Sequence, residues 1–304
     1  MSLTSLIDTP DVRSTLKNCF PTQKNILPKL PLIAPRTKNY GLIGTAFDYI
    51  VRFVLQQKYP HAVDKPWIAE LVVNHGQLGE ISYQYGRDVA VQVKEAFNAA
   101  KQKVQEYRTT GVVANNLFRA ALLLAQIDPF FRAGKLPIPF GVIDPEDVED
   151  LRALYEALPM DLFVSNKVCL LDPTFGASLL VGGADADLVL DHCMIDIKTT
   201  MKLSIQREHY NQLIGYYLLS RIDGITGVPK GYEISSLGIY FSRYGYLHTW
   251  NIKDITDEQT IIDAAAWLER RAEAGFEVPF DEDDGGEDDP EVQEYFRQTM
   301  EQDD

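Results

Sequence analysis

The apolar pattern of the chain changes near residue 160, and this change constrains the fold more than any other feature of the sequence. Upstream, apolar residues recur at helical spacing, which predicts helices over 44–57, 67–74, 87–107, 115–127 and 146–157. Downstream, short apolar runs predict strands over 168–171, 179–181, 185–190, 193–198, 236–241 and 246–251, with helices over 205–221 and 257–274. This order predicts an α/β (α+β) fold in which a mixed-sheet core at 161–280 is flanked by helices and packed against an N-terminal helical region at 1–160.

Acidic residues are concentrated at the C-terminal end of the chain. Residues 281–304 contain twelve Asp and Glu and one Arg, so they contribute −11 of the formal net charge of −15. We therefore expect 281–304 to form a flexible, solvated acidic tail. The other 280 residues carry only −4, and a nearly neutral body is compatible with a basic groove for nucleic acid.

The cysteine and histidine spacing excludes several classes of protein. The three cysteines form no CxxC pair and the five histidines form no HExxH motif, so neither a zinc cluster nor a disulfide framework is indicated. The chain has no run of 18 apolar residues and does not start with the basic-then-apolar layout of a secretory signal. We expect a cytoplasmic protein that makes no membrane contact.

Two acidic strands form the most informative segment. If residues 191–192 are the two-residue turn of a hairpin, Asp187 lies directly opposite Asp196. The same register places Asp185 opposite Lys198. Because strand side chains alternate between faces, these four residues then share one face of the hairpin.

Two carboxylates that lie directly opposite each other on paired strands call for a cation. Two carboxylates about 5 Å apart repel each other, and one stays protonated unless a cation lies between them. Mg²⁺ commonly binds one or two carboxylates together with waters and substrate phosphate oxygens. Lys198 beside such a site would orient a metal-bound water or help to deprotonate it. The simpler alternative is that Asp196 and Lys198 form an exposed ion pair of little energetic value.

This pattern resembles the PD-(D/E)xK nuclease superfamily, in particular its RecB-like and phage-lambda-exonuclease-like branch. The matching residues are Asp187 (or Asp185), the triplet Asp196-Ile197-Lys198, and a downstream Gln-x-x-x-Tyr at Gln212 and Tyr216. The resemblance covers about 60 residues well and 168–250 loosely. It implies a restriction-endonuclease-like core.

The resemblance also implies roles for the matching residues. Asp187 and Asp196 are implied to bind Mg²⁺ or Mn²⁺, with the carbonyl of Ile197 as a further ligand. Lys198 is implied to act at the attacking water. Gln212 and Tyr216, one helical turn apart and so on one helix face, are implied to face the DNA strand or the catalytic groups.

Four further residues are weaker candidates. Asp185 is an alternative metal ligand or a charge beside a turn. Members of this branch often carry a metal-binding His on an early helix, where this chain has Asp48, which is either a third carboxylate ligand or a charge interacting with the helix dipole. Lys202 and Arg207 are candidate substrate-binding residues that contact phosphate, or else they are solvated charges between a strand and a helix.

The sequence thus predicts a Mg²⁺- or Mn²⁺-dependent nuclease that hydrolyses phosphodiester bonds, in DNA rather than RNA, by a metal-activated water. The alternative is a catalytically silent binding or scaffold subunit with this fold, within a defence, repair or phage DNA-processing complex. No GxxxxGK[ST] motif is present, so any unwinding or targeting is expected to come from a protein partner. A homo-oligomer is also compatible with the sequence.

Overall fold

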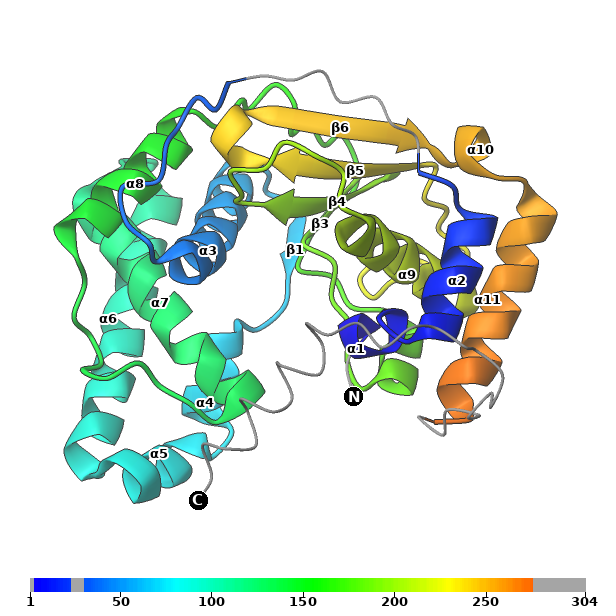
Figure 1. Cartoon of the computed structure of the whole chain (residues 1–304). Coiled ribbons are helices and arrows are strands. Elements are labelled where there is room, and N and C mark those ends of the chain that lie inside the picture. Colours follow the sequence, from blue (N-terminus) through cyan, green and yellow to red (C-terminus); the bar gives the residue numbers. More distant parts are fainter. Residues whose placement is uncertain (1–2, 23–29, 276–304) are drawn as a thin grey trace, which may run out of the picture.

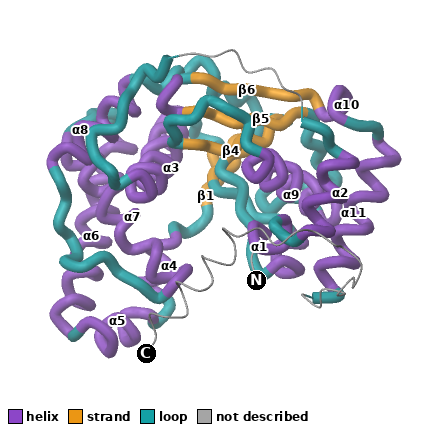
Figure 2. The backbone as a smooth tube through the Cα atoms, in the orientation of Figure 1, coloured by secondary structure: helices purple, strands orange, loops and turns teal. Residues whose placement is uncertain are grey.

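A mixed six-stranded sheet with helices on both faces forms the centre of the computed structural model, which describes residues 3–22 and 30–275 (Figures 1 and 2). The strands follow one another across the sheet in chain order. They are β1 (Ala62–Asp64), β2 (Cys169–Leu171), β3 (Leu188–Leu190), β4 (Cys193–Lys198), β5 (Ser236–Phe241) and β6 (Tyr246–Asn251). The pairs β1–β2 and β4–β5 are parallel, and the other neighbours are antiparallel. The predicted α/β class is therefore confirmed, whereas the predicted acidic tail at 281–304 lies outside the described residues.

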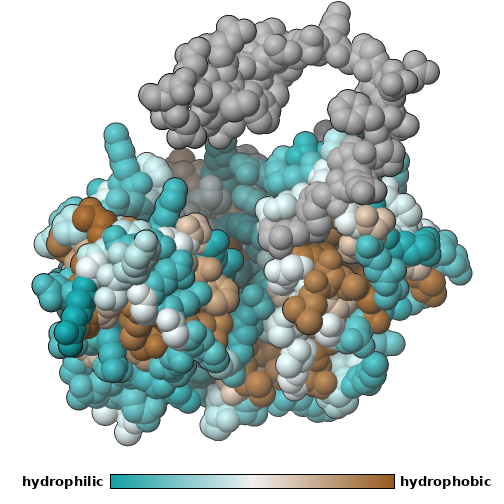
Figure 3. All heavy atoms as spheres, turned by 90° about the horizontal axis from the view of Figure 1, so that it is seen from below, coloured by the Kyte–Doolittle hydropathy of each residue, from teal (hydrophilic) through white to brown (hydrophobic). Residues whose placement is uncertain are grey.

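The helices form two groups, one on each side of the sheet (Figure 1). The first group consists of α3 (Tyr40–Lys58), α4 (Ile68–Asn74), α5 (Gln77–Tyr85), α6 (Arg87–Thr110), α7 (Asn115–Ala133) and α8 (Pro145–Glu156). The second consists of α1 (Leu3–Ile7), α2 (Pro10–Cys19), the 3-10 helix η1 (Gly176–Val181), α9 (Arg207–Asp223), α10 (Ile252–Ile255) and α11 (Glu258–Glu273). Seen from below, the molecular surface is hollowed between the two groups (Figure 3).

Each group of helices builds its own hydrophobic core against one face of the sheet. The core under α3, α6 and α7 contains Ile195 and Ile197 of β4, whereas the core under α9 and α11 contains Met194 of the same strand. This division confirms that Ile195 and Ile197 share a face. By strand alternation, Asp196 and Lys198 belong to the opposite face, which α9 covers.

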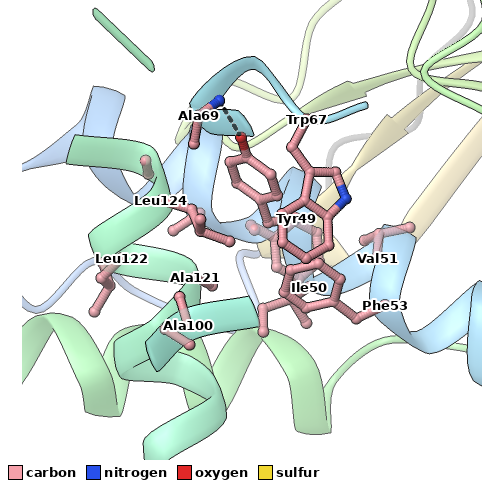
Figure 4. Close-up of a cluster of buried hydrophobic side chains, with 14 of the residues drawn as sticks. Tyr49, Ile50, Val51, Phe53, Trp67, Ala69, Ala100, Ala121, Leu122 and Leu124 are labelled. Carbon is pink, nitrogen blue, oxygen red and sulfur yellow. Dashed lines mark hydrogen bonds between the residues drawn. The ribbon is translucent and has the colours of Figure 1, made fainter. Parts of the chain in front are cut away.

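An aromatic cluster anchors α3 within the first core (Figure 4). The rings of Tyr49, Phe53 and Trp67 lie 5.4–6.1 Å from one another in tilted and edge-to-face arrangements. The Tyr49 hydroxyl also accepts a hydrogen bond from the backbone N–H of Ala69. Burial of such large side chains fixes α3 against the strand and helices that follow it.

Three details of the predicted secondary structure are wrong. Residues 62–64 form β1, so the first 160 residues are not wholly helical; a three-residue strand with partly exposed side chains leaves little periodic signal. Residues 179–181 belong to η1, because the hydroxyl of Ser178 accepts a hydrogen bond from the N–H of Phe175 and stabilises a local turn. The strand expected over 185–190 is regular only from Leu188.

A fully buried ion pair ties the N-terminal region to the sheet. Arg243, in the 3-10 turn η2 (Ser242–Tyr244) between β5 and β6, donates two hydrogen bonds of 2.8 and 2.9 Å to the carboxylate of Asp150 on α8. The side chains are 1% and 0% exposed.

Across the described ranges, no helix has both the length and the apolar character that crossing a membrane requires.

Candidate active site

The hairpin of β3 and β4 has the register that the sequence predicts. The pairs are Leu188 with Ile195, Val189 with Met194 and Leu190 with Cys193, and residues 191–192 form the turn. The next position places Asp187 opposite Asp196.

Asp191 fixes this turn. Its backbone has a φ of +47°, and its carboxylate accepts hydrogen bonds of 2.8–3.2 Å from the backbone N–H groups of Asn166, Lys167 and Val168. Slight burial opposes ionisation, but these bonds outweigh it and lower the pKa of Asp191 to about 2. The turn chemistry therefore determines which acidic residues meet at the other end of the hairpin.

Asp187, Asp196 and Lys198 meet at the end of the hairpin away from the turn. Oδ2 of Asp187 accepts a hydrogen bond of 2.5 Å from the N–H of Ile197. The ammonium group of Lys198 donates to Oδ1 of Asp196 at 3.1 Å and lies 2.9 Å from Oδ2, which accepts no hydrogen bond. Asp196 is only 2% exposed, so the alternative of an exposed strand-face ion pair is wrong.

The Gln-x-x-x-Tyr residues of α9 extend this group. Lys198 donates a second hydrogen bond, of 3.0 Å, to Oε1 of Gln212. The amide nitrogen of Gln212 donates to the hydroxyl of Tyr216 at 2.9 Å. Tyr216 is buried, and its ring stacks on that of Phe175. Four of the predicted site residues thus form one chain of contacts, from Asp196 through Lys198 and Gln212 to Tyr216.

Asp48 of α3 belongs to the same electrostatic cluster. Burial and the neighbouring charge of Asp187 raise its pKa well above the ordinary value, and Lys198 only partly offsets them. The pKa of Asp187 rises to about 7, because burial and the charge of Asp196 outweigh the opposing effects of Lys198 and the Ile197 N–H. Three carboxylates from α3, β4 and the residue preceding β3 therefore repel one another in a poorly hydrated place.

The same carboxylates keep Lys198 charged. Burial alone would lower the pKa of its ammonium group, but Asp196, Asp187 and Asp48 together raise it above the ordinary value. Lys198 is therefore a charged group that donates hydrogen bonds. This favours a role in orienting a water molecule over a role in removing a proton from it.

Asp185 is not brought to this cluster. Its backbone forms an antiparallel bridge with Thr174, and its carboxylate pairs with Lys65, so the expected position opposite Lys198 is wrong. Lys65 also contacts Asp172 at 3.3 Å, and Asp172 in turn accepts a hydrogen bond from Arg52 at 3.1 Å. This chain of alternating charges lies beside the carboxylate cluster and neutralises Asp185.

The two candidate phosphate-binding residues differ in their surroundings. Lys202 is exposed at the start of the segment before α9. Arg207 donates a hydrogen bond of 2.9 Å to the carbonyl of Phe20, and its guanidinium lies over the ring of Tyr210, 5.3 Å from the centroid. Arg207 thus helps to hold the end of α2 against α9, and only Lys202 is free of such contacts.

A cavity of about 330 Å³ opens beside the carboxylates. Asp48, Asp187 and Ile197 line it together with residues that the sequence analysis did not select, namely Thr45, Tyr49, Arg52, Ile68, Asp128, Pro129, Arg132, Ala133, Asp172 and Leu188. The Tyr49 hydroxyl donates a hydrogen bond of 2.8 Å to the buried carboxylate of Asp128. Burial raises the pKa of Asp128 to about 7 despite this bond and the nearby charge of Arg132.

His209 is a further residue near the site that sequence reasoning missed. It lies on α9 one turn before Gln212, and its Nδ1 is buried without a hydrogen-bond partner. Burial and the charge of Lys198 lower its pKa, so the ring is neutral at pH 7. Its spacing of three residues from Gln212 places both on the same face of the helix, and this spacing was the signal in the sequence that could have identified it.

The chemistry of this donor set fits a divalent cation. Asp187 and Asp196 present carboxylate oxygens, and Asp196 Oδ2 is a buried acceptor without a hydrogen bond. A magnesium ion needs only one or two carboxylates, with waters completing its shell, and its charge would relieve the repulsion that raises the pKa of Asp48 and Asp187. Within residues 3–22 and 30–275, however, no three His, Cys, Asp or Glu side chains are already arranged around a common metal position.

The chain matches no protein-family model, no curated protein and no solved structure.

Proposed function

We propose that this protein is a Mg²⁺- or Mn²⁺-dependent nuclease with a restriction-endonuclease-like core of the PD-(D/E)xK superfamily, acting on phosphodiester bonds in DNA. One observation carries the proposal: Asp196 and Lys198 form a largely buried ion pair with one oxygen left without a hydrogen bond, and a second carboxylate, that of Asp187, binds the N–H of the residue between them. A purely structural ion pair has no need of a second, repelled carboxylate.

The arrangement of elements around this pair supports the proposal. Asp187 precedes β3, Asp196 and Lys198 end β4, and the following helix α9 supplies Gln212 and Tyr216. This order of strand, turn, strand and helix is the one that the superfamily resemblance implies.

Each side chain has a role that follows from its contacts. Asp187 and Asp196, with Asp48 and the Ile197 carbonyl nearby, would hold the cation. When bound, Mg²⁺ or Mn²⁺ supplies Lewis acidity at the phosphate and makes water a stronger nucleophile. Lys198, fixed by Asp196 and Gln212, presents its remaining ammonium proton to an attacking water or a phosphate oxygen. Tyr216 holds Gln212 in place.

The competing proposal is a catalytically silent protein on the same fold, and the absence of a preformed three-ligand group among the described residues favours it. In that protein the Asp196–Lys198 pair serves only to join β4 to α9. The two proposals differ in whether cleavage depends on a metal and on Lys198.

The test is cleavage of labelled linear and circular DNA, single- and double-stranded, in Mg²⁺, Mn²⁺ or EDTA. We expect metal-dependent cleavage by the wild type and its loss in Lys198→Ala. Lys167→Ala, which alters an exposed loop lysine, is the matched control and should cleave normally. Absence of cleavage on every substrate, from a folded wild type, would favour the silent protein.

A further inference from the structure

A second cavity adjoins the one beside the carboxylates. The second cavity, of about 580 Å³, shares Thr45 of α3 and Pro129 of α7 with the first. The two adjoining cavities, together called the groove, lie along α3 and α7, with Asp48 and Asp187 at one end and the segment after α7 at the other. A chain molecule whose reacting group lies at the carboxylates would therefore extend along this groove.

The positively charged side chains of the groove differ in whether an ion-pair partner already neutralises them. Arg52 is already neutralised, because it pairs with Asp64 at 2.6 Å and with Asp172 at 3.1 Å. Arg132, exposed in the last turn of α7, lines the first cavity and forms no ion pair with any described residue. Lys135 is exposed, lines the second cavity and is likewise unpaired within the described ranges. Carboxylates line the groove as well: in the second cavity Asp147 accepts hydrogen bonds from Thr37 and Asn39, and Asp144 accepts one from the N–H of Glu146. Arg132 and Lys135 are therefore the side chains available to the phosphates of an anionic ligand.

The second cavity adds an apolar surface. Leu42, Ala125, Leu136, Pro137, Pro139 and Val142 line it. A base-paired duplex presents phosphates and base edges, and its base faces are stacked on one another. Unpaired bases, in contrast, expose flat apolar faces, which this aliphatic wall would remove from water, while the backbone lies against cations.

We propose that the groove between α3 and α7 binds single-stranded DNA, with Arg132 and Lys135 on its phosphates and unpaired bases against the apolar wall. The inference rests on the proposed nuclease function, since it places the scissile phosphate at Asp187 and Asp196. It identifies the substrate as an unpaired strand, and it assigns substrate-binding roles to two residues outside the predicted site.

The test is the salt dependence of binding. Fluorescence anisotropy with a labelled single-stranded oligonucleotide would be measured from 50 to 200 mM salt in Mg²⁺, using Lys198→Ala to prevent cleavage. Each phosphate contact on a single strand contributes about 0.7 to the slope of log affinity against log salt. Adding Arg132→Gln and Lys135→Gln together should therefore reduce the magnitude of the slope by about 1.4.

Arg119→Gln is the matched control, because Arg119 is also exposed on α7 but lines neither cavity; its slope should not change. An unchanged slope in the double variant would overturn the inference, and so would tighter binding of blunt duplex than of single strand. This test and the test of the proposed function can fail independently. If the wild type cleaves DNA but the double variant has an unchanged salt slope, only the groove is refuted. A reduced slope in a protein that never cleaves retains the groove and refutes the nuclease.

Discussion

Two buried ion pairs of opposite character stabilise different parts of this molecule. Arg243 and Asp150 satisfy each other with two hydrogen bonds, and both side chains are almost completely excluded from solvent. Lys198 and Asp196 are largely buried as well, but Oδ2 of Asp196 contacts only the Lys198 ammonium and accepts no hydrogen bond, and the neighbouring carboxylate of Asp187 lines a cavity. The first pair is complete within the protein, whereas the second leaves one carboxylate oxygen without a hydrogen bond, and we propose that a cation binds there.

The largest effect on stability is expected at the complete pair. Asp150→Ala leaves the Arg243 guanidinium buried without its counterion, and loss of one partner of a buried pair typically costs about 3–5 kcal/mol. Urea unfolding of the variant should therefore show a much lower midpoint. A change within 0.5 kcal/mol, roughly the spread of neutral surface substitutions, would show that the two pairs do not differ as described.

An effect that depends on pH is expected at Asp128. Its pKa is about 7 in the folded chain and 3.8 in the unfolded reference, so the folded state binds more protons between these values. The stability contributed by this group is therefore greatest at low pH and declines as pH rises from about 4 to 7, by up to about 1.4 kcal/mol per pH unit. Asp128→Asn removes this contribution.

Unfolding midpoints measured at several pH values from 4 to 8 would test the expectation. The stability of Asp128→Asn relative to the wild type should increase steadily as pH rises. Parallel profiles for the two proteins would mean that Asp128 is not held protonated by its surroundings.

At the incomplete pair, removing a charge should stabilise the fold while abolishing function. Asp187→Asn eliminates the repulsion with Asp196 and Asp48 and keeps an oxygen for the Ile197 N–H. We expect a gain of about 1 kcal/mol above pH 7, within the range of stabilising substitutions at functional sites, together with loss of metal-dependent cleavage. Reduced stability in thermal unfolding without added metal would instead make Asp187 a structural residue.

The smallest effect on cleavage is expected at Gln212, which positions Lys198. Gln212→Ala removes two hydrogen bonds and should cost about 0.5–1.5 kcal/mol for each net interaction lost. Cleavage is expected to fall about 10–100-fold, as for other residues that orient a site. Single-turnover cleavage rates check this, and Gln212→Glu, which keeps an acceptor for Lys198, should recover part of the loss.

The sequence predicts the centre of this fold and site better than their surroundings. The register of β3 and β4 follows from a two-residue turn and strict alternation of side chains. Both are local properties, so the proximity of Asp187 and Asp196 could be predicted from the sequence. The family resemblance implied that Gln212 and Tyr216 face the DNA strand or the catalytic groups, and the structure adds the contact of Gln212 with Lys198.

Other parts depend on contacts between distant segments. Asp185 was misplaced because Lys65, 120 residues earlier, holds it by an ion pair. Arg132 and Asp128 reach the cavity only because α7 packs on α3, and neither has a spacing signal in the sequence. Local patterns contain no information on such pairings.

The central claim is that Asp187 and Asp196 together form a cation site, and calorimetric titration with Mn²⁺ tests it most directly. The wild type should bind Mn²⁺ with a measurable enthalpy, and Asp196→Asn should remain folded but lose at least about 10-fold in affinity. Equal Mn²⁺ binding by both proteins, or none by a folded wild type, would contradict the account.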